Sequence, residues 1–268
     1  MSEILERWRK GDGLPGVLVI DAHTHIGEWP HGENFQTSEE AAVEAEEFMD
    51  AYGVDAACVL AGGYMANGAD YRMGNDWLLD CVRRAPDRLI PFIHINPNDS
   101  QEGVLRELDR MWDHGARCIK LLNAYQAYPG DGPNLMALYE FAQRHRMLVH
   151  NHQWSETEIR TISAQFPELI MIRAHGGATR LSHEIPNVYD NIWSLHRMGT
   201  VERGIQEYGP EKILFGSDAF MNDISVGIGM VVYADIPDDH KRAVLGLNVA
   251  RLLSYAGALP DSLAGRLA

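Results

Sequence analysis

The chain has 268 residues, 46% of them hydrophobic, and a formal net charge of −15. That length and apolar content suit one large barrel or two ordinary domains. An acidic surface repels phosphate backbones, which excludes nucleic acid as an expected partner and means that an anionic substrate must be met by local cations.

The N-terminal stretch "MSEILERWRKGDG" is polar, and no apolar run approaches the roughly 20 residues of a membrane span. The three cysteines, Cys58, Cys81 and Cys118, are far apart and odd in number, so no disulfide framework is expected. These features predict a cytoplasmic protein that contacts neither membrane nor nucleic acid.

Eight short apolar runs, each suited to a strand buried on both faces, alternate with longer amphipathic stretches. The predicted strands cover residues 16–23, 54–61, 89–95, 116–122, 147–152, 169–175, 187–193 and 212–218. The predicted helices cover 38–53, 75–86, 100–115, 134–146, 155–167 and about 238–256, with N-caps at Ser38, Asn75, Ser100 and Ser155. Between the sixth and seventh strands, "GGATRLSHEIP" is too short and too rich in glycine for a confident helix, so a loop or a single turn is predicted there.

This alternation predicts an α/β protein: a single-domain (β/α)₈ barrel of the TIM type, with its core at about residues 17–255. An open, doubly wound parallel sheet is the alternative. In a (β/α)₈ barrel the active site forms at the C-terminal ends of the strands, so the residues at those ends indicate the chemistry.

Ionisable residues gather at the predicted strand ends. They are His23 and His25 on the first strand, Lys120 on the fourth, His150 and His152 on the fifth, Arg173 and His175 on the sixth, and Asp218 on the eighth. Alternate residues of a strand face the same way, so His23 and His25 project together. With an imidazole from strand five and Asp218 they form a set of three nitrogens and one oxygen that suits Zn²⁺. The competing interpretation is that these are core histidines bonded to the backbone.

Several motifs together resemble the amidohydrolase superfamily. They are "DAHTHIG", "GARCIKL", "LVHNH", "IRAHGG", "ILFGSDAF" and "LGLNVARLL", and they look most like the amidohydrolase-2 branch, which includes aminocarboxymuconate-semialdehyde decarboxylase. The resemblance implies a distorted (β/α)₈ barrel with one metal ion held by His23, His25, His150 and Asp218. It also implies that His175 hydrogen-bonds the activated water or the substrate. His152, two residues beyond His150, is expected beside the metal ligands or the substrate.

The resemblance implies hydrolysis of a small carbonyl substrate, such as a lactone, ester or amide that carries a carboxylate. Zn²⁺ would activate a water molecule and Asp218 would take its proton. Non-oxidative decarboxylation of an unsaturated or aromatic acid is the alternative. Many such decarboxylases show Glu-x-His on strand one, whereas His-x-His suits both hydrolases and the aminocarboxymuconate type. A barrel that only binds a ligand is a third interpretation, and a homodimer is plausible because members of this branch often pair.

Lys120 has two interpretations. It could be carboxylated and bridge a second metal ion, or it could serve as a cation that holds a substrate carboxylate, which we favour. Asp21 is expected to lie deeper than the histidine pair but in phase with it, and to orient an imidazole or pair with Arg173. His94 is expected to be structural. The residues expected to line the substrate pocket are Tyr125 and Trp154 with, more weakly, Trp29, Tyr64, Arg72, Arg180, His183, His196 and Met221.

Overall fold

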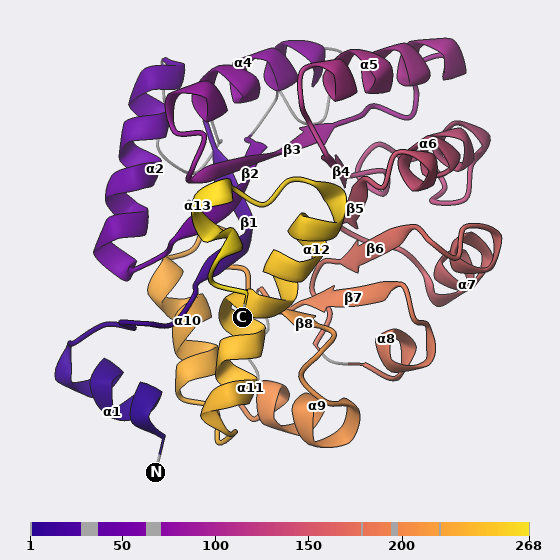
Figure 1. The fold of residues 1–268 in the computed structure, drawn as a ribbon. Helices are drawn as coiled ribbons and strands as arrows, with labels where there is room; N and C mark the ends of the chain where they lie inside the picture. The colour runs from indigo at the N-terminus through magenta and orange to yellow at the C-terminus, as the bar shows by residue number, and fades with distance from the viewer. Residues whose placement is uncertain are drawn as a thin grey trace.

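The computed structural model describes residues 2–27, 37–62, 71–177, 179–193, 198–219 and 221–267. These residues form eight parallel strands that are paired in chain order, with helices around the outside (Figure 1). The strands are β1 (Ile20–Ile26), β2 (Ala56–Ala61), β3 (Leu89–His94), β4 (Cys118–Leu121), β5 (Leu148–Asn151), β6 (Ile170–Arg173), β7 (Val188–Asn191) and β8 (Ile213–Leu214). All eight lie within or overlap the predicted runs.

The helices alternate with the strands. They are α1 (Glu3–Lys10), α2 (Ser38–Tyr52), α4 (Tyr71–Arg84), α5 (Gln101–Asp113), α6 (Pro133–Arg144), α7 (Glu156–Gln165), α8 (Arg180–Glu184), α9 (Thr200–Tyr208), α10 (Ile224–Val232), α11 (Asp238–Arg242), a π-helical turn η1 (Ala243–Leu247), α12 (Asn248–Ala256) and α13 (Asp261–Ala264). Ser100 and Ser155 are N-caps as predicted. Thr37 caps α2 in place of Ser38 because it forms a capping box with Glu40. The short α8 matches the loop or single turn predicted before β7.

The barrel closes between β1 and the segment that follows β8. The N–H of Ala22 donates to Phe215 O at 3.0 Å, the N–H of Asp218 to His23 O at 2.8 Å, and the N–H of His25 to Ala219 O. These bonds join the first strand to the end of the last, which confirms the (β/α)₈ barrel and excludes the open doubly wound sheet.

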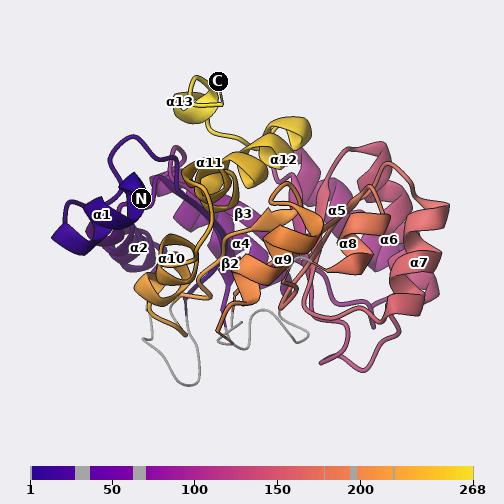
Figure 2. The same cartoon turned by 90° about the horizontal axis from the view of Figure 1, so that it is seen from below.

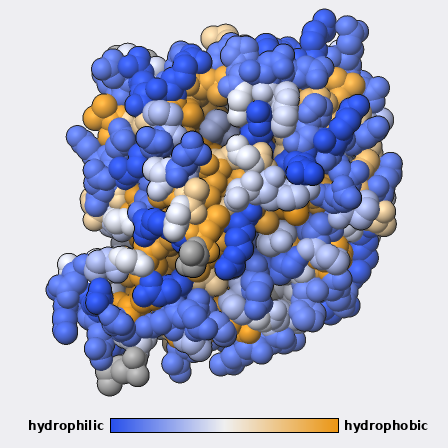
Figure 3. Space-filling model, in the orientation of Figure 1, coloured by the Kyte–Doolittle hydropathy of each residue, from blue (hydrophilic) through white to orange (hydrophobic). Residues whose placement is uncertain are grey.

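Apolar side chains fill the barrel at the N-terminal ends of the strands. Ile20, Phe92 and Leu148 pack there with Val249 and Leu253 of α12. Figures 1 and 2 show α12 across this end of the barrel, with α13 and the C-terminus beyond it. Hydrophilic residues cover most of this face, with hydrophobic residues visible between them (Figure 3). Among the described helices, none combines the length and apolar character needed to cross a membrane.

Strand β1 has an irregularity that determines where its side chains point. Its register with β2 shifts between Asp21 and Thr24. Within this interval Ala22 packs in the barrel interior, and the next residue, His23, also contacts strands across the barrel. The local bulge therefore changes the alternation of faces. The prediction that Asp21 is in phase with the histidine pair is wrong for this reason.

Candidate metal centre

Three side chains bring their donor atoms together at the C-terminal end of the barrel. His23 and His25 lie on β1, and Asp218 follows β8. The two Nε2 atoms are 3.2 Å apart, and each lies 3.2 Å from Oδ1 of Asp218. All three residues are buried. The strand places the two histidines side by side, and barrel closure places Asp218 against both.

Donor atoms at these separations fit a divalent metal ion. Tetrahedral Zn²⁺ with bonds of about 2.0–2.1 Å holds neighbouring ligand atoms about 3.4 Å apart. Oδ1 of Asp218 is buried and accepts no hydrogen bond from the described residues. Such a carboxylate oxygen is costly to bury, and a cation among the three donors would remove that cost. In the described parts of the chain, no other three His, Cys, Asp or Glu residues have donor atoms grouped closely enough to share an ion.

His150, the predicted fourth ligand, lies beside His23 but at the other edge of its ring. The Nδ1 atoms of His23 and His150 are 3.5 Å apart, whereas Nε2 of His23 faces His25 and Asp218. Nε2 of His150 is buried without a hydrogen-bond partner in the regions that the structure covers. His150 is adjacent to the three donors without joining them, so its role as a ligand stays a prediction.

Lys120 on β4 meets the same edge of His23. Its Nζ is 3.4 Å from Nδ1 of His23, and its side chain is fully buried. Burial lowers the pKa of Lys120 to about 7, and the charge of Asp218 opposes this shift. Burial, and next the charge of Lys120, hold the pKa of His23 and of His150 well below the usual range. Both imidazoles are therefore neutral at pH 7, the form in which histidine binds metals.

A second group of rings connects this centre to the surface. Nε2 of His152 is 3.2 Å from Nε2 of His175 and 2.8 Å from Oη of Tyr125. The ring of Trp193 lies 3.7 Å from that of His175 between centroids, and it stacks on His23 at 4.6 Å. Because Tyr125 is 67% exposed, this group extends from the buried histidines to solvent.

The backbone is left-handed at both His175 and Asp218, with φ of +53° and +60°. Such conformations cost a non-glycine residue about 1–3 kcal/mol and persist where the surroundings impose them, often at functional sites. At Asp218 the constraint is the hydrogen bond from its N–H to His23 O. The turn therefore directs the carboxylate towards the histidine pair.

Asp21 binds backbone and hydroxyl groups. Its carboxylate accepts hydrogen bonds from the N–H groups of His23 and Ser217, both at 3.0 Å, and from the hydroxyl of Ser217. Burial raises the pKa of Asp21 to about 6. The predicted pairing with Arg173 is wrong, because Nε of Arg173 donates to Asp190 at 2.7 Å. Asp21 instead fastens β1 to the segment after β8.

The structure places two tryptophans differently from what the sequence predicts. Trp154, predicted to line the substrate pocket, is buried in the outer core, where its Nε1 donates to Oη of Tyr139 at 3.1 Å. That placement corrects the prediction. Trp193 was not predicted, although it contacts both groups of the site. It lies two residues beyond β7, as His175 lies two residues beyond β6, so the same inspection of strand ends could have identified it.

The weaker pocket candidates are engaged elsewhere or lie outside the described residues. Arg72 pairs with Asp99, and Arg180 pairs with Glu156 and Glu184. His183 packs against Tyr208, and Met221 is 48% exposed. Trp29, Tyr64 and His196 lie outside the described residues.

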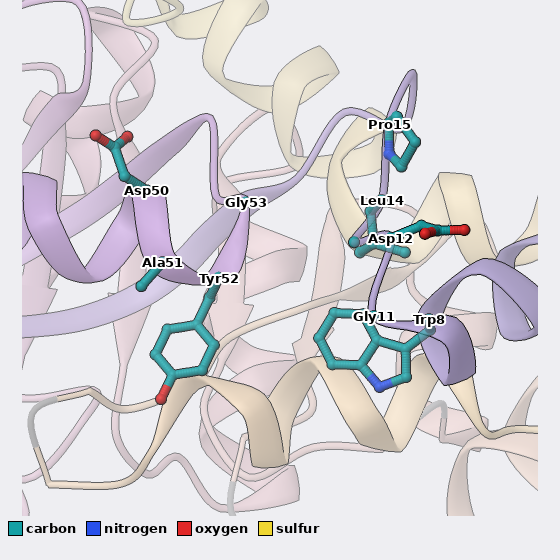
Figure 4. Close-up of a pocket in the computed structure, with 10 residues that line it drawn as sticks. Trp8, Gly11, Asp12, Leu14, Pro15, Asp50, Ala51, Tyr52 and Gly53 are labelled. Atoms are coloured by element: carbon teal, nitrogen blue, oxygen red, sulfur yellow. The ribbon is translucent and has the colours of Figure 1, made fainter.

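A hollow of about 530 Å³ lies between α1 and the end of α2, towards the N-terminal end of the barrel. Trp8 lines it from the α1 side and Tyr52 from the α2 side (Figure 4). None of the predicted site residues lines it. The candidate site is therefore identified by its grouped donor atoms. It lies at the opposite end of the strands from this hollow.

Fold and site together define a class: a (β/α)₈ barrel with a histidine–carboxylate centre at the C-terminal ends of its strands. A family model described as Amidohydrolase matches residues 20–254. The chain belongs to this amidohydrolase family, which confirms the resemblance carried by the motifs. Among curated proteins, none matches the sequence significantly.

Solved structures share the fold at low sequence identity. An uncharacterised TIM-barrel protein from Bordetella bronchiseptica is 18% identical with a TM-score of 0.74, over 90% of this chain and 100% of that one. A dihydroxybenzoic acid decarboxylase from Polaromonas sp. JS666, with bound manganese and the inhibitor 2-nitroresorcinol, is 14% identical with a TM-score of 0.71, over 89% and 97% of the two chains. A protein from Acinetobacter baumannii described as a probable 2-pyrone-4,6-dicarboxylic acid hydrolase is 13% identical with a TM-score of 0.63, over 88% and 99%.

Proposed function

We propose that this protein is a metal-dependent hydrolase that cleaves a C–O or C–N bond at the carbonyl of a small carboxylated lactone, ester or amide. The observation that carries the proposal is the equal 3.2 Å spacing among Nε2 of His23, Nε2 of His25 and Oδ1 of Asp218. Membership of the amidohydrolase family supports it. Zn²⁺ suits these nitrogen and oxygen donors, and the manganese in the Polaromonas enzyme makes Mn²⁺ the main competitor.

When bound, a divalent ion would polarise the substrate carbonyl and lower the pKa of a water molecule. His23, His25 and Asp218 would hold the ion. His150 would add a donor through its Nε2, which is buried and unbonded among the described residues. We favour one ion per chain, with Lys120 as a cation.

Asp218 and His175 would divide the proton chemistry. Oδ2 of Asp218 accepts a hydrogen bond from Nδ2 of Asn222 at 3.2 Å, which fixes the carboxylate beside the histidines. Asp218 would accept the proton of the attacking water and pass it to the leaving group. Burial lowers the pKa of His175, so its ring is neutral and could donate one N–H to the carbonyl oxygen as charge develops there.

The substrate carboxylate requires a local cation because the chain carries a net charge of −15. Lys120 would supply that charge inside the barrel, because a substrate carboxylate beside it would favour the protonated form against the lowering of its pKa by burial. His152 and Tyr125, which form a hydrogen bond at 2.8 Å, would contact the substrate nearer the surface.

Decarboxylation is the second candidate. The likeness to a dihydroxybenzoic acid decarboxylase favours an aromatic acid as substrate, and Lys120, buried beside the centre, would hold its carboxylate as it would that of a hydrolase substrate. We rank it second because many decarboxylases of aromatic acids have Glu-x-His on strand one, whereas this chain has His-x-His, which suits hydrolases and the aminocarboxymuconate type alike. Release of CO₂ without uptake of water would establish decarboxylation in place of hydrolysis.

The test is to assay Asp218→Asn on lactones, esters, amides and aromatic acids, with Asp223→Asn as the matched control. Asp223 is an exposed helix N-cap five residues away, where it accepts hydrogen bonds from Ser225 N and from the hydroxyl of Tyr52. Loss of a positioned base predicts a rate about 10²- to 10⁴-fold lower for Asp218→Asn, and a near-native rate for the control. A full rate in Asp218→Asn would contradict the assigned role.

A further inference from the structure

The carboxylate of Asp190 on β7 accepts an unusual number of hydrogen bonds. Oδ1 accepts from Nε of Arg173 at 2.7 Å and lies 2.5 Å from its Nη2. Oδ2 accepts from the N–H and the hydroxyl of Thr179, both at 3.1 Å, and from the hydroxyl of Ser182 at 2.7 Å. Asp190 is fully buried and lies outside the proposed metal centre.

The donors to Asp190 come from both sides of one short segment. Arg173 is the last residue of β6, Thr179 is the N-cap of α8, and Ser182 lies in that helix. The two ends are also joined directly, because Nη2 of Arg173 donates to Oγ1 of Thr179 at 2.7 Å. His175 lies between them. One carboxylate therefore fixes where the turn that carries His175 begins and ends.

The backbone of the turn that carries His175 is in close contact with Asp190. His175 has a left-handed backbone, which needs support from its surroundings. The next residue is Gly176, and a Cβ atom there would overlap Oδ1 of Asp190. The chain thus passes directly over the carboxylate after His175, and no larger side chain fits at Gly176 while Asp190 keeps its place.

We propose that Asp190 is a positioning residue for His175. It holds the turn so that Nε2 of His175 meets His152 at 3.2 Å and its ring lies on Trp193. Asp190 acts through Arg173, Thr179 and Ser182 and does not touch the reacting atoms. Its importance for catalysis rests on the role proposed for His175, whereas its effect on the placement of His175 does not.

The test compares Asp190→Asn with Glu107→Gln. Glu107 on α5 is a matched control, because it too is buried and its carboxylate accepts from Arg110 Nε and Nη2 at 2.8 Å and from Asn75 at 2.9 Å. Both changes remove the charge of a buried carboxylate that pairs with an arginine. Only Asp190 touches the segment of His175, so the pair separates a positioning effect from general loss of stability.

The primary readout is the histidine ring spectrum, measured by NMR on protein with labelled histidine, with the His175 signal assigned from His175→Gln. We expect the His175 signal to shift or broaden in Asp190→Asn while the His23 signal stays in place. Glu107→Gln should leave both unchanged. A native His175 signal in folded Asp190→Asn, or the same shift in Glu107→Gln, would overturn the inference.

If Asp190→Asn does not fold, Ser182→Ala carries the test because it removes the 2.7 Å donor to Oδ2 and the bonds of that hydroxyl to the backbone of Thr179, while the Asp190 carboxylate and its other donors stay in place. We expect a smaller shift of the His175 signal in that variant, and an unchanged signal overturns the inference.

Activity provides a second readout on metal-loaded enzyme. We expect kcat to fall about 10- to 100-fold in Asp190→Asn with unchanged metal content, as is typical when an outer partner of a site is lost. An equal fall in Glu107→Gln would overturn the catalytic part of the inference. If the native protein has no metal-dependent activity, the proposed function fails, while the ring spectrum still decides whether Asp190 positions His175.

Discussion

A histidine on a barrel strand can serve the structure or the chemistry, and its hydrogen bonds separate the two cases. His94 on β3 is held by the protein, because its ring Nε2 bonds to Ala61 O at 3.1 Å and its backbone N–H donates to Oδ1 of Asn75 at 2.8 Å. His150 on β5 is just as buried, but its Nε2 has no partner in the described part of the chain. The structural role predicted for His94 therefore has a clear physical basis, and His150 remains available as a ligand.

His94 also predicts how stability depends on pH. Burial lowers its pKa to about 3 in the folded protein, against 6.5 when unfolded. Its contribution is therefore fully present above pH 6.5 and is lost as the pH falls towards 3, because only the unfolded chain takes up the proton. The slope reaches about 1.4 kcal/mol per pH unit for one group.

As the pH falls from 6.5 to 5, we expect the free energy of unfolding to decrease less in His94→Gln than in the native protein. The measurement is urea denaturation, with the metal content of both proteins kept the same. His114→Gln is the control, since His114 is exposed and its Nδ1 bonds only to Arg110 O among the interactions described. Parallel pH dependence in His94→Gln and the native protein would show that His94 is not the source of the slope.

At the scale of single elements, local sequence patterns predict the strands but not the details of their pairing. The alternation of apolar runs and amphipathic stretches identifies every strand, because strands and helices differ in period. It does not reveal the register shift within β1, which depends on pairing with β2. It could not place Asp21 either, because that carboxylate binds Ser217, far away in the sequence, as well as the N–H of His23.

The C-terminal helical segment contains a glycine whose role is steric. Gly246 lies in the π-helical turn η1, where a Cβ atom would overlap the carbonyl of Leu18. Gly229 in α10 has open surroundings, since its Cβ would meet only Tyr233 at 3.9 Å. The two helical glycines therefore make a matched pair.

We expect Gly246→Ala to lower the free energy of unfolding by about 1–3 kcal/mol through overpacking against Leu18, just before β1. Gly229→Ala should be neutral or raise it by up to about 1 kcal/mol, because alanine favours helix. Urea denaturation of both variants is the measurement. Equal effects in the two variants would mean that contact with Leu18 is not what requires glycine at position 246.

At the scale of the whole molecule, the candidate centre lies across the seam where the barrel closes. His23 and His25 come from the first strand and Asp218 follows the last, so an ion shared by them would link the two edges of the sheet. The same closure brings Lys120 and His150 to His23 from the far side of the barrel.

The barrel and most of the site could be predicted, because a (β/α)₈ fold places all strand ends together whatever their distance in sequence. The rest depends on side-chain packing. Trp154 follows a strand that ends in site histidines, yet its indole turns to Tyr139 in the outer core. Which edge of His23 meets His150 likewise depends on ring orientations that alternation along a strand does not determine.

The central claim is that His23, His25 and Asp218 hold a divalent metal ion, and metal content tests it most directly. Elemental analysis should be done on native protein, His23→Ala and the control His114→Ala after identical purification. We predict about one ion per chain in the native protein and the control, and almost none in His23→Ala. Equal metal content in His23→Ala and the native protein, or no metal and no metal affinity in the native protein, would contradict the account.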